Sequence, residues 1–335
     1  MIAKFAPTMR SLGILVVLVL LIIAFGVLTP NFLDPGNLFN IARQVTTLGI
    51  CAVGFSFVLI TGGIDLSVGY QISVYVVVCG ILMAEMGLPW VVSVACVIVI
   101  AVVVGLINGI IITTTGVAPL IVTLSMMTIL NGISYLLSKG LPISGFPSGF
   151  SILGQGAVFG IPVSLFVLLA AWAVGLFILN KTYLGRYFYA IGNNQEAARL
   201  SGVSTKRTTV LVYVLCAVFT AIGAIVLLSR LNSAQSATGA GFEFSVITAC
   251  VLGGVSVMGG RGSLFGAIVG VLIVGVLDNG LVLMNVSEYV QLVIKGMILL
   301  IAVIYDAMSK ASRGKPKSIG GIPITRAGRV SSGQA

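Results

Sequence analysis

Residues 90–114 decide the fold: they read W-V-V-S-V-A-C-V-I-V-I-A-V-V-V-G-L-I-N-G-I-I-I-T-T and include no charged side chain. About 20 apolar residues in a helix cross the roughly 30 Å hydrocarbon core of a bilayer. Strands of membrane β-barrels instead alternate apolar and polar residues over about ten positions. This uninterrupted run therefore predicts a transmembrane helix.

The same pattern recurs along the chain. Further runs expected to cross the membrane lie at about 11–29, 41–61, 66–86, 118–138, 163–180, 209–231, 244–259, 264–284 and 288–306. The first is longer than the roughly 7 to 15 apolar residues of a cleavable signal, so we expect it to remain as a membrane helix. The prediction is an all-α polytopic membrane protein of about ten transmembrane helices.

The composition excludes several classes of function. The 335 residues are 58% apolar and 8% charged, whereas soluble domains contain about 25% charged residues. The sequence has no histidine, no C-x-x-C pair among its five cysteines, no paired-carboxylate motif and no Walker A motif. We therefore expect no catalytic, cofactor-binding or metal-binding residues in this chain, and no enzymatic activity of its own.

Basic residues predict the orientation of the chain, because cytoplasmic loops are enriched in Lys and Arg. Ten spans put both termini on one side, and placing them in the cytoplasm puts 14 of the 18 basic residues there. These are Lys4, Arg10, Lys181, Arg186, Arg199, Lys206, Arg207, Arg261, Lys310, Arg313, Lys315, Lys317, Arg326 and Arg329. The net charge of +10 thus indicates membrane topology, and we expect a lipid bilayer rather than nucleic acid as the partner.

Two short motifs recur five spans apart. The string I-D-L-S-V at 64–68 resembles F-E-F-S-V at 242–246, and G-L-I-N-G at 105–109 resembles G-V-L-D-N-G at 275–280. An odd number of spans per repeat makes the two repeats inverted, a common transporter construction. We expect inverted five-helix repeats at about 11–138 and 163–306.

These repeats would lie in a transmembrane permease domain at 1–308 that also carries a cytoplasmic loop at 181–207. A basic, disordered cytoplasmic tail is expected at 309–335.

Between the second and third spans lies T-G-G-I-D-L-S-V-G at 61–69. Glycines around an acidic residue allow a tight turn, or a broken helix, near the membrane face. Asp65 and Ser67 are expected to cap the next helix. From the residues alone, the segment could equally be only a capped turn.

The loop at 181–207 predicts a short helix. Asn193 or Asn194 can cap a helix through 196–200, and Gly202 can end it. Glu196 in its first turn and Arg199 near its end both favour the helix dipole. Such a helix offers a rigid surface to a partner, although spacing alone also fits an ordinary solvated loop helix.

The sequence resembles the membrane permease subunits of bacterial ABC importers for simple sugars, the ribose/xylose/arabinose-type family. The resemblance rests on G-G-I-D-L-S-V-G at 62–69 and Y-A-I-G-N-N-Q-E-A-A-R-L-S-G-V at 189–203, and it extends from about Thr29 to Asp306. It implies a coupling role toward the ATPase for Asn194, Glu196, Ala197, Ala198, Arg199 and Gly202. It implies a structural or gating role for Gly62, Gly63, Asp65, Ser67 and Gly69.

The resemblance also implies partners and location. These are a second permease subunit, identical or paralogous, two ATP-binding subunits that hold ATP and Mg, and a periplasmic sugar-binding protein. That binding protein is expected to dock on 30–40, 139–162 and 232–243. The chain would lie in the bacterial inner membrane.

Other readings stay open: a proton- or sodium-driven secondary transporter using Asp65 or Asp278, an ABC permease for nucleosides or branched-chain amino acids, and a membrane scaffold.

Polar residues inside spans are functional suspects because they are costly to bury in lipid. Asp278 and Lys295 lie at matching depth, roughly 10–12 Å below the turn that joins their spans, which predicts a buried ion pair with a mainly structural role. Residues expected to line the sugar pathway, or else to bond between helices, are Gln71, Asn108, Thr123, Ser125 and Asn131. Gly105/Gly109 and Gly266/Gly270 have the spacing of close helix contacts.

Overall fold

A computed structural model describes residues 9–313, with side chains for 13–308, and this part of the chain is mostly helical. The long helices are α1 (Met9–Leu28), α2 (Pro35–Ile60), α3 (Val68–Gly80), α4 (Trp90–Thr115), α5 (Pro119–Ser138), α7 (Val163–Lys181), α10 (Thr205–Leu231), α12 (Leu264–Leu283) and α13 (Glu288–Arg313). The shorter ones are α6 (Ser148–Gln155), α8 (Tyr183–Asn193), α9 (Gln195–Leu200) and α11 (Phe242–Leu252). A π-helical turn, η1 (Ile81–Glu85), continues α3.

Eight of these helices are long and apolar enough to cross a membrane, with α3 and η1 counted together. They are α2, α3–η1, α4, α5, α7, α10, α12 and α13. Each of the ten expected runs contains a helix, but α1 and α11 fall outside this set of eight. The chain is therefore a multi-pass membrane protein.

The expected span at 244–259 is wrong in its extent. The helix α11 has 11 residues and ends at Leu252, which corresponds to about 16 Å and cannot cross a core of roughly 30 Å. Gly253 follows, and Gly254 has a φ of +83°. A left-handed glycine is a common way to end a helix, so the apolar residues 255–259 lie in an irregular loop.

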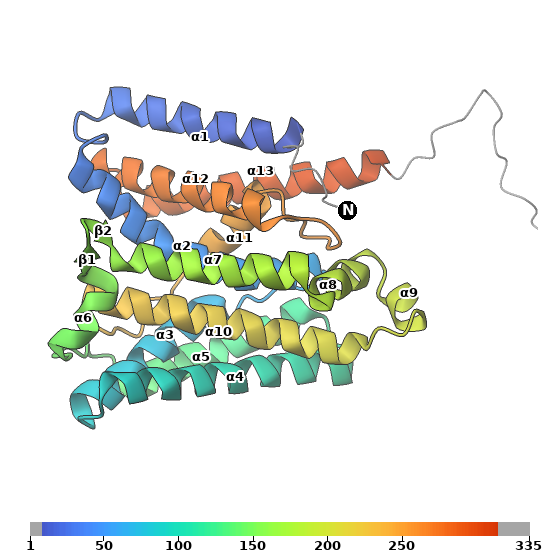
Figure 1. The fold of residues 1–335 in the computed structure, drawn as a ribbon, viewed down its shortest axis with the longest axis horizontal. Coiled ribbons are helices and arrows are strands. Elements are labelled where there is room, and N and C mark those ends of the chain that lie inside the picture. Colours follow the sequence, from blue (N-terminus) through green and yellow to red (C-terminus); the bar gives the residue numbers. More distant parts are fainter. Residues whose placement is uncertain (1–8, 314–335) are drawn as a thin grey trace, which may run out of the picture.

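The long helices lie side by side along one direction (Figure 1). The helices α8 and α9 lie at the same end as the start of α1 and the far end of α13, here called the α9 end. At the opposite α6 end, the Gly/Pro/Ser-rich stretch after α5 forms α6 and a hairpin. Its strands β1 (Ala157–Val158) and β2 (Ile161–Pro162) pair antiparallel. The helix α13 continues to Arg313, into the segment expected to be tail, and residues 314–335 lie outside the described part.

Glycines bring neighbouring helices into close contact, which is how membrane helices commonly associate. A Cβ at Gly105 of α4 would lie 2.5 Å from Val214 Cα of α10, and one at Gly109 would lie 2.7 Å from Val210 Cα. In α12, Gly266 and Gly270 face backbone atoms of the α11 segment. Both predicted glycine pairs are thus confirmed as helix contacts.

The helices α3 and α11 both begin inside the bundle. The chain before α11 does not stay at the surface: Ser236 is 4% exposed, and Gly239 N donates a hydrogen bond of 3.0 Å to Ser73 Oγ of α3. Gly69, in the first turn of α3, lies against Gly239 O and the carboxylate of Glu243 in α11. The loop 232–243, expected to be an outer docking loop, is therefore partly buried.

The contact between α4 and α10 yields a stability prediction. Gly105→Val should lower the thermal unfolding temperature of the detergent-purified protein, because overpacking a close contact costs about 1–3 kcal/mol. The matched control is Gly132→Val in α5, where no atom lies within 4 Å of an added Cβ. Equal melting temperatures for the two variants would contradict the close approach of α4 and α10.

Candidate functional site

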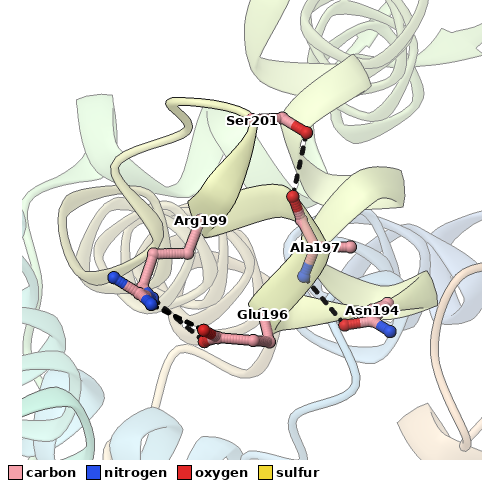
Figure 2. A network of polar contacts seen from close by, with 5 residues as sticks. All are labelled: Asn194, Glu196, Ala197, Arg199 and Ser201. Atoms are coloured by element: carbon pink, nitrogen blue, oxygen red, sulfur yellow. Dashed lines mark hydrogen bonds and ion pairs between the residues drawn. The ribbon is translucent and has the colours of Figure 1, made fainter.

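The loop between α7 and α10 carries the short helix expected from the sequence. Asn194 is the N-cap of α9: its Oδ1 accepts a hydrogen bond of 2.9 Å from Ala197 N (Figure 2). Ser201 Oγ donates to Ala197 O at 2.9 Å, and Gly202 follows with a φ of +86°. Of the two asparagines considered for the cap, the structure uses Asn194.

Glu196 and Arg199 form an ion pair on the outer face of α9. Arg199 Nη2 lies 2.6 Å from Glu196 Oε1, and Nε lies 2.9 Å from Oε2, so the contact is bidentate (Figure 2). The guanidinium of Arg199 lowers the pKa of Glu196 below its usual value, because it favours the charged carboxylate. The neighbouring Leu200 is 73% exposed. The helix α9 thus presents a fixed charge pair and an apolar side chain to solvent.

The helix α8 connects α9 to the bundle. Tyr189 OH donates to Gly262 O at 2.7 Å, and Gly260 N donates to Ile60 O at 2.8 Å. A Cβ at Gly192 would overlap both Ile60 O and Gly260 N. The end of α8 therefore contacts two segments at once: the end of α2, and the loop 253–263 between α11 and α12.

A buried carboxylate organises the segment between α2 and α3. Asp65 is 0% exposed. Its Oδ1 accepts from Ser67 N at 3.0 Å and from Ser67 Oγ at 2.5 Å, and its Oδ2 accepts from Gln71 Nε2 at 3.3 Å. Ser67 is the N-cap of α3, yet its hydroxyl makes no capping bond to the helix. The expected side-chain cap is therefore replaced by a local network around Asp65.

Two further helices bond to this segment. From α4, Asn108 Nδ2 donates to Ser67 Oγ at 3.1 Å. From α5, Thr123 Oγ1 lies 3.2 Å from both Ile64 O and Leu66 N. The irregular backbone thus finds hydrogen-bond partners inside the protein, as irregular backbone at membrane depth requires.

The five residues expected to line a pathway are placed differently from one another. Gln71, Asn108 and Thr123 are fully buried: the first two bond to Asp65 or Ser67, and Thr123 bonds the backbone of the same segment. Ser125 is exposed and donates to Ile121 O of its own helix at 2.9 Å. Asn131 is partly buried, with no hydrogen bond at Oδ1. The structure therefore does not bring these five residues together in one site.

Each glycine of the 61–69 segment is required for a different structural reason. Gly62 has a φ of +83°, a conformation that other residues rarely adopt. A Cβ at Gly63 would lie 2.6 Å from Tyr213 OH of α10. Gly69 leaves room for Glu243, whose side chain is buried and whose Oε2 has no hydrogen-bond partner. The segment therefore requires these glycines for its backbone shape and its close contacts.

Asp278 of α12 and Lys295 of α13 form an ion pair. Lys295 Nζ lies 3.0 Å from Asp278 Oδ2, and the two side chains are 21% and 15% exposed. Asp278 Oδ1 is buried without a hydrogen-bond partner. The ion pair joins α12 to α13, and Asp278 Oδ1 has no hydrogen-bond partner within the described part of the chain.

Comparisons with known proteins agree over most of the chain. The family described as "Branched-chain amino acid transport system / permease component" matches residues 37–303. The ribose import permease protein RbsC of Bacillus subtilis is 41% identical, over 92% of this chain and 96% of the relative. The L-arabinose transport system permease protein AraH of Escherichia coli is 37% identical, over 90% and 92%.

A third relative is the galactose/methyl galactoside import permease protein MglC of Salmonella typhimurium, 38% identical over 92% of this chain and 98% of the relative. No solved structure matches the chain.

The Asp65 network yields a second prediction. Asp65→Ala leaves buried donors on Ser67 and Gln71 without an acceptor, and this should destabilise the detergent-purified protein by about 3 kcal/mol. The matched control is Asp34→Ala, because Asp34 is exposed and makes no capping bond. Similar unfolding temperatures for both variants would contradict the organising role of Asp65.

The ion pair yields a third prediction, tested by a double-mutant cycle. Asp278→Leu and Lys295→Met should each destabilise the protein by roughly 3 kcal/mol, because each leaves one buried charge unpaired. The double variant should be milder than either single variant, since no charge then remains. A double variant as unstable as the sum of the two single variants would mean that the side chains do not interact.

Proposed function

The chain belongs to the branched-chain amino acid transport system permease family and, within it, to the sugar permeases of ABC importers; from this we propose that it forms the translocation pathway of an ATP-driven importer for a simple sugar. Transport would run from periplasm to cytoplasm by alternating access. The observation that carries the proposal is the near full-length similarity to ribose, arabinose and galactose permeases.

The named relatives favour a sugar over an amino acid as the substrate. The family description names branched-chain amino acid transport, whereas three relatives that match 90% or more of this chain are named for ribose, arabinose and galactose. Ribose and arabinose are pentoses and galactose is a hexose, so we propose that the substrate belongs to the pentose/hexose class.

The α9 end is proposed to face the cytoplasm. Lys181, Lys206 and Arg207 flank α8 and α9 at this end, and Arg186 lies in α8 itself, which agrees with the enrichment of cytoplasmic loops in basic residues. On this orientation α9 docks on one of two ATP-binding subunits that hold ATP and Mg. The exposed pair Glu196–Arg199 and Leu200 would form the contact.

The contacts between helices support the inverted repeat. The helix α10 packs along α4 as α12 packs along α2, and α3 packs on α5 as α11 packs on α13. We therefore propose that α2–α5 and α10–α13 are equivalent, within repeats at about 11–138 and 163–306. The interrupted helices α3 and α11 are then equivalent elements whose starts meet at Gly69 and Glu243.

The remaining partners follow from the exposed surfaces. Few residues in the apolar stretches of three helices are buried: 11% of them in α13, and 28% in each of α4 and α5. We propose that these faces contact lipid and a second permease subunit. At the opposite side of the inner membrane, residues 30–40 and 139–162 would receive the periplasmic sugar-binding protein.

A secondary transporter that uses Asp65 or Asp278 is the rival that the geometry least supports. That mechanism needs a carboxylate free to bind and release a proton or sodium ion. Asp65 is held by three hydrogen bonds from Ser67 and Gln71, and Asp278 is paired with Lys295. Neither carboxylate stands free in this conformation.

The coupling proposal gives a fourth prediction. Gly202→Val should abolish sugar uptake and binding-protein-stimulated ATP hydrolysis in the assembled importer, because valine at a φ of +86° forces the turn after α9 to rearrange. No atom lies within 4 Å of an added Cβ, so the bundle itself is not disturbed. Radiolabelled uptake and phosphate release in proteoliposomes measure the effect.

The matched control is Gly87→Val. Gly87 has a φ of +66°, equally open surroundings, and lies between η1 and α4. The Gly87→Val variant should retain sugar uptake. Normal uptake by Gly202→Val would overturn the assignment of α9 as the coupling helix.

A further inference from the structure

The loop 253–263, between α11 and α12, is closed on itself by hydrogen bonds to one residue. Ser256 N donates to Arg261 O at 3.1 Å, and Ser256 O accepts from Gly259 N at 3.2 Å. The hydroxyl of Ser256 also accepts from Met258 N, at 3.2 Å. The loop therefore has a defined shape with Ser256 at its centre, and it can pass a displacement from one of its contacts to another.

The carboxylate of Asp306, in α13, binds the centre of this loop. Asp306 Oδ2 accepts hydrogen bonds from Ser256 Oγ at 2.8 Å and from Val257 N at 3.2 Å. Asp306 lies within the apolar span of α13 and is partly buried. An ionisable side chain in such a span is costly and commonly has a function. One oxygen of Asp306 thus ties α13 to both a side chain and the backbone of the loop.

Other residues of the loop bond to α8. Tyr189 OH donates to Gly262 O at 2.7 Å, and Asn193 Nδ2 donates to Gly260 O at 3.3 Å. Asn193 is the last residue of α8, and Asn194 follows as the N-cap of α9. The loop therefore connects α13 to the helix that leads directly into α9.

The helix α13 has little packing to hold it in place, because only 11% of the residues in its apolar stretch are buried. Two polar contacts attach it to α12 and to the loop before α12. Lys295 binds Asp278, and Asp306 binds the loop. Lys295 and Asp306 are separated by about three helical turns, or roughly 16 Å, so they lie on the same face of α13. Without Asp306, the end of α13 near α9 would no longer be tied to the loop.

We propose that Asp306 is a positioning residue for the coupling of ATP hydrolysis to transport. By binding Ser256 and Val257, Asp306 makes the loop 253–263 carry a displacement of α8 and α9 to α13. The inference rests on the proposed function, because it requires that the ATP-binding subunits displace α9.

A purely structural role for Asp306 predicts a different result. Loss of structure would lower assembly, sugar uptake and ATP hydrolysis together. Loss of transmission would lower sugar uptake while ATP hydrolysis continues, because α9 would still follow the ATP-binding subunits without moving α13. The amount of sugar transported per ATP hydrolysed therefore distinguishes the two roles.

The test uses the complete importer, with its ATP-binding subunits and its sugar-binding protein, in proteoliposomes. Uptake of radiolabelled D-ribose, L-arabinose and D-galactose is measured first, and a sugar that is taken up is used for the variants. If the unaltered importer takes up none of the three sugars, the proposed function is refuted and the inference falls with it.

Asp306→Ala should lower the amount of sugar transported per ATP hydrolysed by about tenfold, a size typical of residues that connect two coupled sites. ATP hydrolysis stimulated by the sugar-loaded binding protein should continue. Asp306→Asn keeps an oxygen that can accept from both donors, so it should retain normal coupling.

Ser256→Ala tests the same contact from the loop and is the smaller change if Asp306→Ala does not assemble. It removes one of the two donors to Asp306, so it should lower the ratio of sugar to ATP less than Asp306→Ala does. The double variant should be less impaired than the product of the two single losses, because both changes remove one shared contact.

The matched control is Glu288→Ala, because Glu288 is the other carboxylate of α13 and is exposed in its first turn, at the opposite end. It should transport normally. The inference is overturned if Asp306→Ala keeps the normal ratio of sugar to ATP, or if uptake and ATP hydrolysis fall together. Equal loss in Asp306→Asn and Asp306→Ala would also overturn it, since the acceptor oxygen would then not matter.

Discussion

The structure depends on one constraint: irregular backbone within an apolar helix bundle must find its hydrogen-bond partners in the protein itself. Residues 61–67 meet it through Asp65, whose carboxylate binds Ser67 and Gln71, and through Thr123, which contacts Ile64 O and Leu66 N. Because the polar backbone groups of this segment have hydrogen-bond partners, α3 can begin inside the bundle. The start of α11 can then lie against α3 at Gly69.

The positions of the helices could be predicted from the uninterrupted apolar runs, but the ends of helices inside the bundle could not. The run 90–114 became α4 (Trp90–Thr115) because nothing in it competes with a helix. The run 244–259 is also mainly apolar, yet its helix stops at Leu252 because Gly253 and Gly254 form a turn in which Gly253 packs against Gly266. Hydropathy reflects burial, and a helix and a buried loop are both buried. The hydropathy of the sequence therefore could not distinguish the helix from the loop that follows it. In the same way, the sequence of the loop 232–243 predicts a surface loop, yet this loop is partly buried in the bundle.

The functional residues were predictable where the chemistry is local in sequence. The cap and the terminating glycine of α9 are local in sequence, so the sequence narrowed them to Asn193 or Asn194 and to Gly202. The ion pair between Glu196 and Arg199 was not predicted, although both residues were placed in the helix. Asp278 and Lys295 were paired from helix depth, because their helices are joined by a short turn. Gly69 and Glu243 meet only through the packing of α3 against α11. No spacing rule brings these two residues together.

The contact at Gly192 has a mechanical consequence. The end of α8 touches Ile60 and Gly260 with no side chain between the backbones, so little compressible material separates them. If α9 has the coupling role proposed for it, a displacement of α9 would be passed on to the end of α2 and to the loop after α11 together. One of these segments leads into α3 and the other leaves α11, so the proposed coupling would link both interrupted helices through one contact.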